Sequence, residues 1–155
     1  MRPDVPTHVL CGEDLSPGDR AELGSYTIST GELVAFARQW DPQFFHVDEE
    51  RAVTDGYFGG LIASGVQTLA IYQRLMVDSL FQHWDVIGGA GIRDLQFRKP
   101  VRPGDTLTGT TVIKDVQLQP GRGRARIDYG GVLTNQHAEQ VLVLTTSAYL
   151  RMRTT

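Results

Sequence analysis

One apolar segment with helical spacing, residues 64–82, constrains the fold of this 155-residue chain more than any other feature. Its apolar residues cover most of the helical circumference, and a helix of that kind is buried. Four later segments are rich in Val, Ile, Leu and Thr, as strands are: residues 86–98, 106–118, 124–134 and 140–152. Gly, Pro and Asn separate them, so we expect short turns and an antiparallel sheet. One long central helix wrapped by an antiparallel sheet is an α+β fold.

The chain has the length of one domain, and we expect residues 1–155 to share a single core. Residues 1–24 are rich in Pro, Gly and charged residues, which predicts an irregular N-terminal arm. Residues 26–28 are a candidate for a short strand after that arm.

Capping residues predict where the helices begin. Ser29 and Glu32 have the spacing of a capping box, so a helix is expected from Ser29 onward. Asp48 is expected to cap a second, short helix. Ser64 and Gln67 repeat the capping-box spacing at the start of the long helix.

Composition excludes several classes of protein. The formal net charge of −3 gives no overall positive field for nucleic acid. A single cysteine, Cys11, allows neither an intrachain disulfide nor a cysteine metal cage, and no cluster with metal-ligand spacing is present. No signal-peptide pattern and no apolar run long enough to cross a membrane are found, so a cytoplasmic protein is expected.

Asp41 and His46 are the side chains best suited to moving protons near neutral pH, and they lie five residues apart. Pro42 disfavours helical angles at Asp41, so the preceding helix should end there and the chain should turn back before His46. A turn of this length can direct both side chains into one pocket. Taken alone, the pair also fits an ordinary turn Asp and a surface His.

This stretch, together with the run of residues 58–65 and the segment of residues 97–105, resembles the MaoC-like family of (R)-specific enoyl-CoA hydratases, which has the hotdog fold. The usual family loop is Gly-Asp-x-Asn-Pro-x-His. Here Trp40 replaces the Gly, Gln43 the Asn and Phe44 the Pro, while the Asp–His spacing is kept. The resemblance covers most of the chain, from the helix before the loop to the last strand.

The resemblance implies that Asp41 and His46 hold a water molecule and are the catalytic pair. It also implies that the backbone N–H of Gly65 is an oxyanion-hole donor, a role that suits the first N–H groups of a helix. Alternatively, Gly65 has a structural role only, as a small residue where the helix packs closely on a neighbouring element. Phe45, Phe58 and Ser64 are further expected to contact the substrate.

The implied reaction is addition of water to, or its removal from, the 2,3 position of an acyl thioester carried by coenzyme A or acyl carrier protein. No other cofactor is expected. Two alternatives stay open: a hotdog thioesterase, and a non-catalytic acyl-binding subunit of a hydratase complex. We also expect a homodimer or an assembly of dimers, because a curled sheet of this size leaves unpaired edges.

Overall fold

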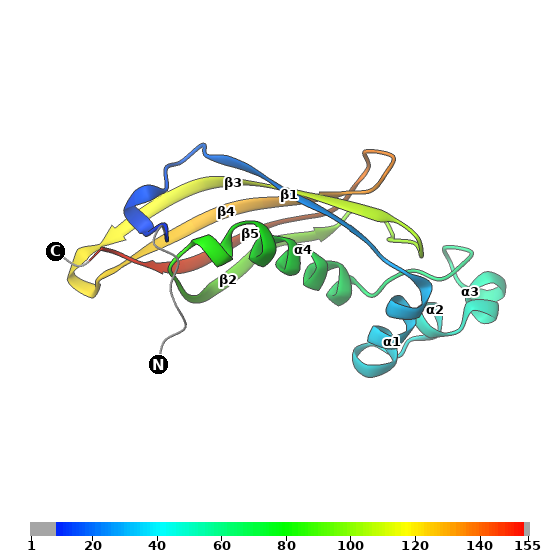
Figure 1. Cartoon of the computed structure of the whole chain (residues 1–155). Coiled ribbons are helices and arrows are strands. Elements are labelled where there is room, and N and C mark those ends of the chain that lie inside the picture. Colours follow the sequence, from blue (N-terminus) through cyan, green and yellow to red (C-terminus); the bar gives the residue numbers. More distant parts are fainter. Residues whose placement is uncertain (1–8, 154–155) are drawn as a thin grey trace.

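The computed structural model describes residues 9–153, and its centre is a five-stranded antiparallel sheet (Figure 1). The spatial order of the strands is β1-β3-β4-β5-β2. Their bounds are β1 Arg20–Thr27, β2 Val86–Phe97, β3 Thr106–Gln119, β4 Arg124–Thr134 and β5 Gln140–Arg151. The four predicted C-terminal strands are therefore confirmed to within one residue at each end. The order also makes β2 an edge strand, because it pairs with β5 alone.

Within residues 9–153, four α-helices accompany the sheet: α1 Thr30–Trp40, α2 Phe44–Val47, α3 Glu49–Asp55 and α4 Gly65–Ser79. Short 3₁₀ turns lie at Gly12–Asp14, Phe81–His83 and Pro120–Arg122. The sheet curves over α4, and α1, α2 and α3 form a group beyond the N-terminal end of α4 (Figure 1). No helix within residues 9–153 is long and apolar enough to span a membrane.

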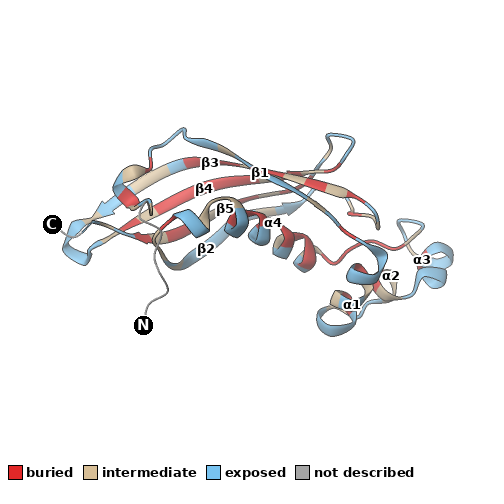
Figure 2. Ribbon diagram, viewed as in Figure 1, coloured by how far each residue is buried: buried red, intermediate tan, exposed pale blue. Residues whose placement is uncertain are grey.

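The core lies between α4 and the sheet. Leu75 and Met76 of α4 are buried with Leu133 of β4 and Leu142 of β5, all of them at most 5% exposed. Figure 2 shows the buried residues concentrated in β3, β4, β5 and one side of α4. Helix propensity alone does not stabilise a helix of this length, so packing of this side holds α4 in place.

The structure corrects three expectations. Residues 20–24 are not part of an irregular arm, because β1 begins at Arg20 and pairs with β3 as far as Thr27. Residues 1–8 of that arm lie outside the described residues. The long helix is shorter than expected and is not buried all round, since Val66 is 57% and Val77 40% exposed.

The third correction concerns the caps. Ser29 and Glu32 form the predicted capping box, and Asp48 caps α3 by accepting the N–H of Arg51. Ser64 caps α4 through the N–H of Val66, but Gln67 does not close a box with it. The side-chain nitrogen Nε2 of Gln67 donates instead to the backbone carbonyl oxygen of Glu32, 3.3 Å away.

Candidate active site

The chain between α1 and α2 brings Asp41 and His46 together. Asp41 ends α1 and lies outside helical angles, and Pro42 follows it. The one turn of α2 then places His46 so that its Nε2 is 3.2 Å from Oδ2 of Asp41. The side chain of His46 is 5% exposed and that of Asp41 23% exposed. The two side chains therefore meet at a site that is largely shielded from water.

The other nitrogen of His46 fixes the ring. Nδ1 lies 2.7 Å from the carbonyl oxygen of Ile62, which can only accept, so Nδ1 carries a hydrogen. A neutral ring in that form has a lone pair on Nε2, facing the carboxylate of Asp41. Direct contact between Nε2 and Oδ2 therefore needs one further proton between the two groups. Phe45 packs edge-on against the ring, with centroids 4.4 Å apart, and holds it from the other side.

Hydrogen bonds favour the ionised form of Asp41. Ser64 Oγ donates to Oδ2 and Gln43 Nε2 donates to Oδ1, each at 2.8 Å. Burial alone would raise the pKa of Asp41, but these two bonds and the neighbouring His46 outweigh it, so the pKa lies below the ordinary value of an aspartate. Asp41 is thus a carboxylate that is held in place at both oxygens.

Ser64 connects the catalytic candidates to the start of α4. It is fully buried, donates to Asp41 and accepts the N–H of Val66. The hydroxyl therefore caps the helix and orients the carboxylate at the same time. The cap was predictable because it involves residues close together in the sequence. The hydrogen bond to Asp41 was not, because Asp41 lies 23 residues away.

Gly65, the first residue of α4, lies against the ring of Phe97 at the end of β2. A Cβ atom at position 65 would lie 2.5 Å from Cζ of Phe97, closer than real contacts allow. No acceptor among the described residues takes the N–H of Gly65. This N–H lies at the positive end of α4, where an oxyanion would be stabilised.

These groups line one cavity of about 370 Å³. Of the residues expected from the sequence, Asp41, His46, Phe58 and Gly65 line it, whereas Phe45 and Ser64 lie behind its wall. Further lining residues include Gln43, Ile62, Ala63, Thr68, Phe97, Arg98, Lys99, Pro100, Val101 and Val141. The wall thus combines apolar side chains with the titratable pair and with two cations, Arg98 and Lys99.

Three groups that contact the candidate catalytic residues were not predicted from the sequence: the side-chain amide of Gln43, the backbone carbonyl of Ile62 and the ring of Phe97. Gln43 was visible only as a departure from the family loop. The carbonyl of Ile62 has no side-chain signal at all. Phe97 lies 32 positions from Gly65, and only the folded sheet brings the two together. Within residues 9–153 no group of three or more His, Cys, Asp or Glu residues is placed to hold a metal ion.

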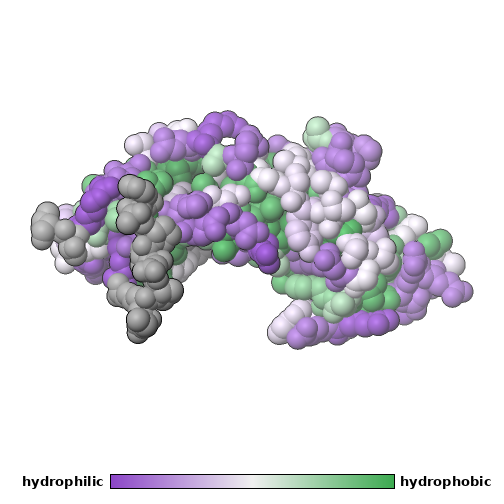
Figure 3. All heavy atoms as spheres, viewed as in Figure 1, coloured by the Kyte–Doolittle hydropathy of each residue, from purple (hydrophilic) through white to green (hydrophobic). Residues whose placement is uncertain are grey.

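Apolar side chains also reach the surface around the site. Figure 3 shows hydrophobic residues between α4 and the α1–α3 group and within that group, above a hydrophilic lower rim. Trp40 is 66% and Phe58 43% exposed, and Phe58 lies at the cavity itself. Tyr57, which packs edge-on against Phe58, is 95% exposed. The approach to the cavity therefore offers aromatic surface to an apolar group.

Comparisons with known proteins agree with this fold. The family model described as MaoC like domain matches residues 15–129. A Bacillus subtilis (strain 168) protein named Uncharacterized protein YdeM is 37% identical over 115 residues, which cover 74% of this chain and 79% of that protein.

Two solved structures are also similar. A MaoC-like dehydratase from Rhodospirillum rubrum has a TM-score of 0.84 and 37% identity, over 94% of this chain and 99% of that one. R-hydratase PhaJ1 from Pseudomonas aeruginosa has a TM-score of 0.73 over 92% of this chain and 86% of that one; at 24% identity it establishes the fold alone. The hotdog architecture is confirmed, and the chain belongs to the MaoC-like domain family.

Proposed function

We propose that this protein is a hydratase/dehydratase that adds water to, or removes it from, the 2,3 position of an acyl thioester. The observation that carries the proposal is the juxtaposition of Asp41, His46 and the free N–H of Gly65 in one cavity. Many members of the MaoC-like family are hydratases or dehydratases, which supports the same reaction class.

Asp41 and His46 can carry out both proton transfers that hydration requires. Hydration forms a C3–O bond from water and a C2–H bond, and one water is consumed for each double bond. Asp41 and His46 hold the water on the cavity side of their contact, accept one of its protons and return one proton to C2. Since Nδ1 of His46 is fixed on Ile62, only Nε2 exchanges a proton with the cavity.

The thioester carbonyl gains negative charge while C2 receives or loses its proton. In the proposed complex its oxygen accepts the N–H of Gly65, at the positive end of α4. Apolar lining residues such as Phe97 and Val141 suit the acyl part of the substrate. The carrier is coenzyme A or acyl carrier protein, and no other cofactor takes part.

A panel of 2-enoyl and 3-hydroxyacyl thioesters tests the proposal. Loss of the enoyl absorbance and release of free thiol are recorded separately, on both carriers. A hydratase consumes the enoyl group and leaves the thioester intact. Thiol release without loss of the enoyl group would identify a thioesterase. Tight binding of the panel without either change would identify a non-catalytic acyl-binding subunit.

The proposal includes a homodimer that forms through β2. Strand β2 is an edge strand on which Ile87 and Ile92 are about half exposed. Phe97, 55% exposed, belongs both to this edge and to the cavity wall. A second copy paired at β2 would cover the apolar edge and would lie beside the cavity.

A further inference from the structure

A second groove, of about 410 Å³, lies on the face of the sheet that points away from α4. Two neighbouring glycines of β4, Gly130 and Gly131, show which face of the sheet is which. A Cβ at Gly131 would meet the Tyr72 hydroxyl of α4 at 2.2 Å, so that position faces the helix. Gly130 therefore faces the other way, because successive positions of a strand alternate. The groove is on the Gly130 side of the sheet. It adjoins the cavity of Asp41 and His46 at Arg98, which lines both.

Three cations line this groove: Arg20 of β1, Arg98 after β2 and Lys114 of β3. Asp94 is the one carboxylate that lines it. No carboxylate of the described residues lies within 4 Å of the charged nitrogens of Arg20, Arg98 or Lys114. The groove thus has a local positive charge in a chain whose formal net charge is −3.

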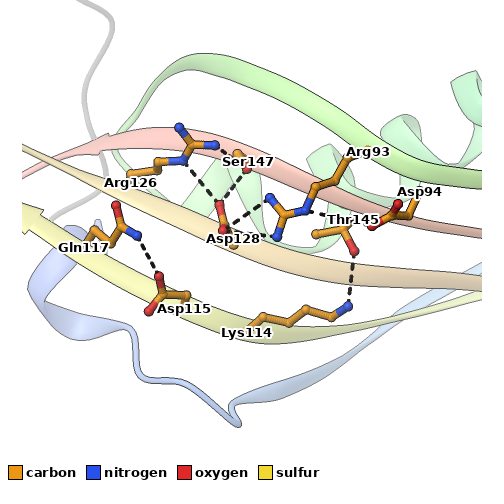
Figure 4. A network of polar contacts seen from close by, with 9 residues as sticks. All are labelled: Arg93, Asp94, Lys114, Asp115, Gln117, Arg126, Asp128, Thr145 and Ser147. Atoms are coloured by element: carbon orange, nitrogen blue, oxygen red, sulfur yellow. Dashed lines mark hydrogen bonds and ion pairs between the residues drawn. The ribbon is translucent and has the colours of Figure 1, made fainter.

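Lys114 is held across the floor of the groove. The lysine side chain passes over Gly130, where an added Cβ atom would lie 2.6 Å from Cε of Lys114. Its Nζ donates to Oγ1 of Thr145, 3.1 Å away (Figure 4). A lysine ammonium has three donors, and a neutral hydroxyl takes one of them. Lys114 is therefore positioned by the sheet without being neutralised by it.

Other carboxylates of this face are engaged elsewhere. Arg93, Arg126 and Ser147 converge on Asp128, with Ser147 Oγ 2.5 Å from its carboxylate (Figure 4). Asp115 accepts from Gln117 at 2.9 Å. Asp128 and Asp115 are therefore engaged away from the three cations of the groove, which lies further along the same strands.

We propose that this groove is a binding site for a phosphate-bearing small ligand. Guanidinium groups and an ammonium group are the side chains that bind phosphate best, and a groove lined by one sign of charge concentrates anions. The volume is in the range of small-molecule sites. The same chemistry is presented by inorganic pyrophosphate, by a free nucleotide and by the nucleotide end of a thioester carrier.

Calorimetric titration of the whole protein with pyrophosphate, ADP and adenosine tests the site without any turnover. We expect pyrophosphate and ADP to bind and adenosine not to bind. Tighter binding of ADP than of pyrophosphate supports a nucleotide ligand, and equal binding supports recognition of the phosphates alone. Equal binding of adenosine and ADP, or no binding of pyrophosphate at millimolar concentration, would overturn the proposal.

Lys114→Gln should weaken pyrophosphate binding about tenfold or more, the scale of a lost charge-assisted hydrogen bond, and Lys114→Arg should restore most of it. The control is Arg74→Gln, which removes the same charge from an exposed pair with Asp78 on α4. His46→Gln should bind pyrophosphate as the unchanged protein does, which separates this site from the candidate active site. Unchanged binding in Lys114→Gln would refute the assignment.

Discussion

The ring of Phe97 occupies the space that any side chain at position 65 would need. Three of its ring carbons lie 2.5–2.9 Å from the place of a Cβ on Gly65. With the ring in this position, the end of an edge strand thereby favours glycine at the first residue of α4. This contact supports the packing explanation for Gly65. It is compatible with an oxyanion role because no described residue accepts the N–H of Gly65.

If this contact is what excludes a side chain at position 65, removing the Phe97 ring should compensate for a substitution of Gly65. Gly65→Ala should lower kcat and the melting temperature, because overpacking costs about 1–3 kcal/mol and shifts either the ring or the helix start. Adding Phe97→Ala should restore part of both quantities, with a coupling energy of about 0.5–3 kcal/mol between the two sites. Phe97→Ala alone is the control. A double variant no better than Gly65→Ala would show that the ring is not the cause.

The oxyanion role makes a separate prediction. Gly65→Val should lower kcat more than it weakens binding of a non-reacting thioester analogue, since a lost oxyanion donor costs about 2.7–4 kcal/mol in the transition state. Steady-state kinetics and analogue titration give the two quantities. Equal losses in both would leave Gly65 with a packing role only.

Removal of either catalytic candidate should nearly abolish hydration. Asp41→Asn and His46→Gln should each reduce the rate by about 10²–10⁴-fold, the usual contribution of a general acid or base. Enoyl absorbance measures the rate, and circular dichroism checks that both variants fold. A variant that keeps more than about half of the original rate would contradict the assignment of that residue.

The carboxylate of Asp41 should give the protein an acid-sensitive contribution to stability. Its folded-state pKa lies below the ordinary value of 3.8, so the contribution is fully present above that value and is lost as the pH falls through the folded pKa. Denaturant unfolding at several pH values should show that the difference between the unchanged protein and Asp41→Asn shrinks in this acid range. A difference that is constant with pH would contradict the prediction.

Ser64→Ala should act on stability and on the pH profile together. The helix loses its cap and Asp41 loses a donor, which should lower the free energy of unfolding by about 1–3 kcal/mol. The pKa of Asp41 should rise, so the acid limb of the activity profile should move to higher pH. Ser25→Ala, at an exposed hydroxyl on β1, is the control. An unmoved acid limb would limit Ser64 to its capping role.

Local signals in the sequence predicted much of this fold. The capping box of Ser29 and Glu32 and the cap at Asp48 each depend on residues three positions apart, and the structure contains all of them. The last four strands were visible because β-branched residues and turn residues alternate in blocks. The helix-and-sheet arrangement followed from these elements and from the family resemblance.

Features that depend on distant contacts were missed. Residues 20–24 look irregular because Gly and charged residues predominate there, yet pairing with β3 makes them a strand. Gln67 has capping-box spacing, but its amide reaches Glu32 of α1 instead. Within the candidate site, the Asp–His spacing was visible, whereas the contacts of Ser64 and Phe97 exist only after α4 and β2 are in place.

The assembly prediction concerns β2. We expect light scattering coupled to size exclusion to give at least twice the 17.1 kDa mass of one chain, because the edge strand exposes both backbone groups and apolar side chains. Ile92→Glu should weaken the dimer and lower activity together, since the same edge borders the cavity through Phe97. Leu118→Glu is the control, because Leu118 is equally exposed but lies on β3. A mass near 17.1 kDa with full activity would show that one chain completes the site, and that β2 is covered in some other way.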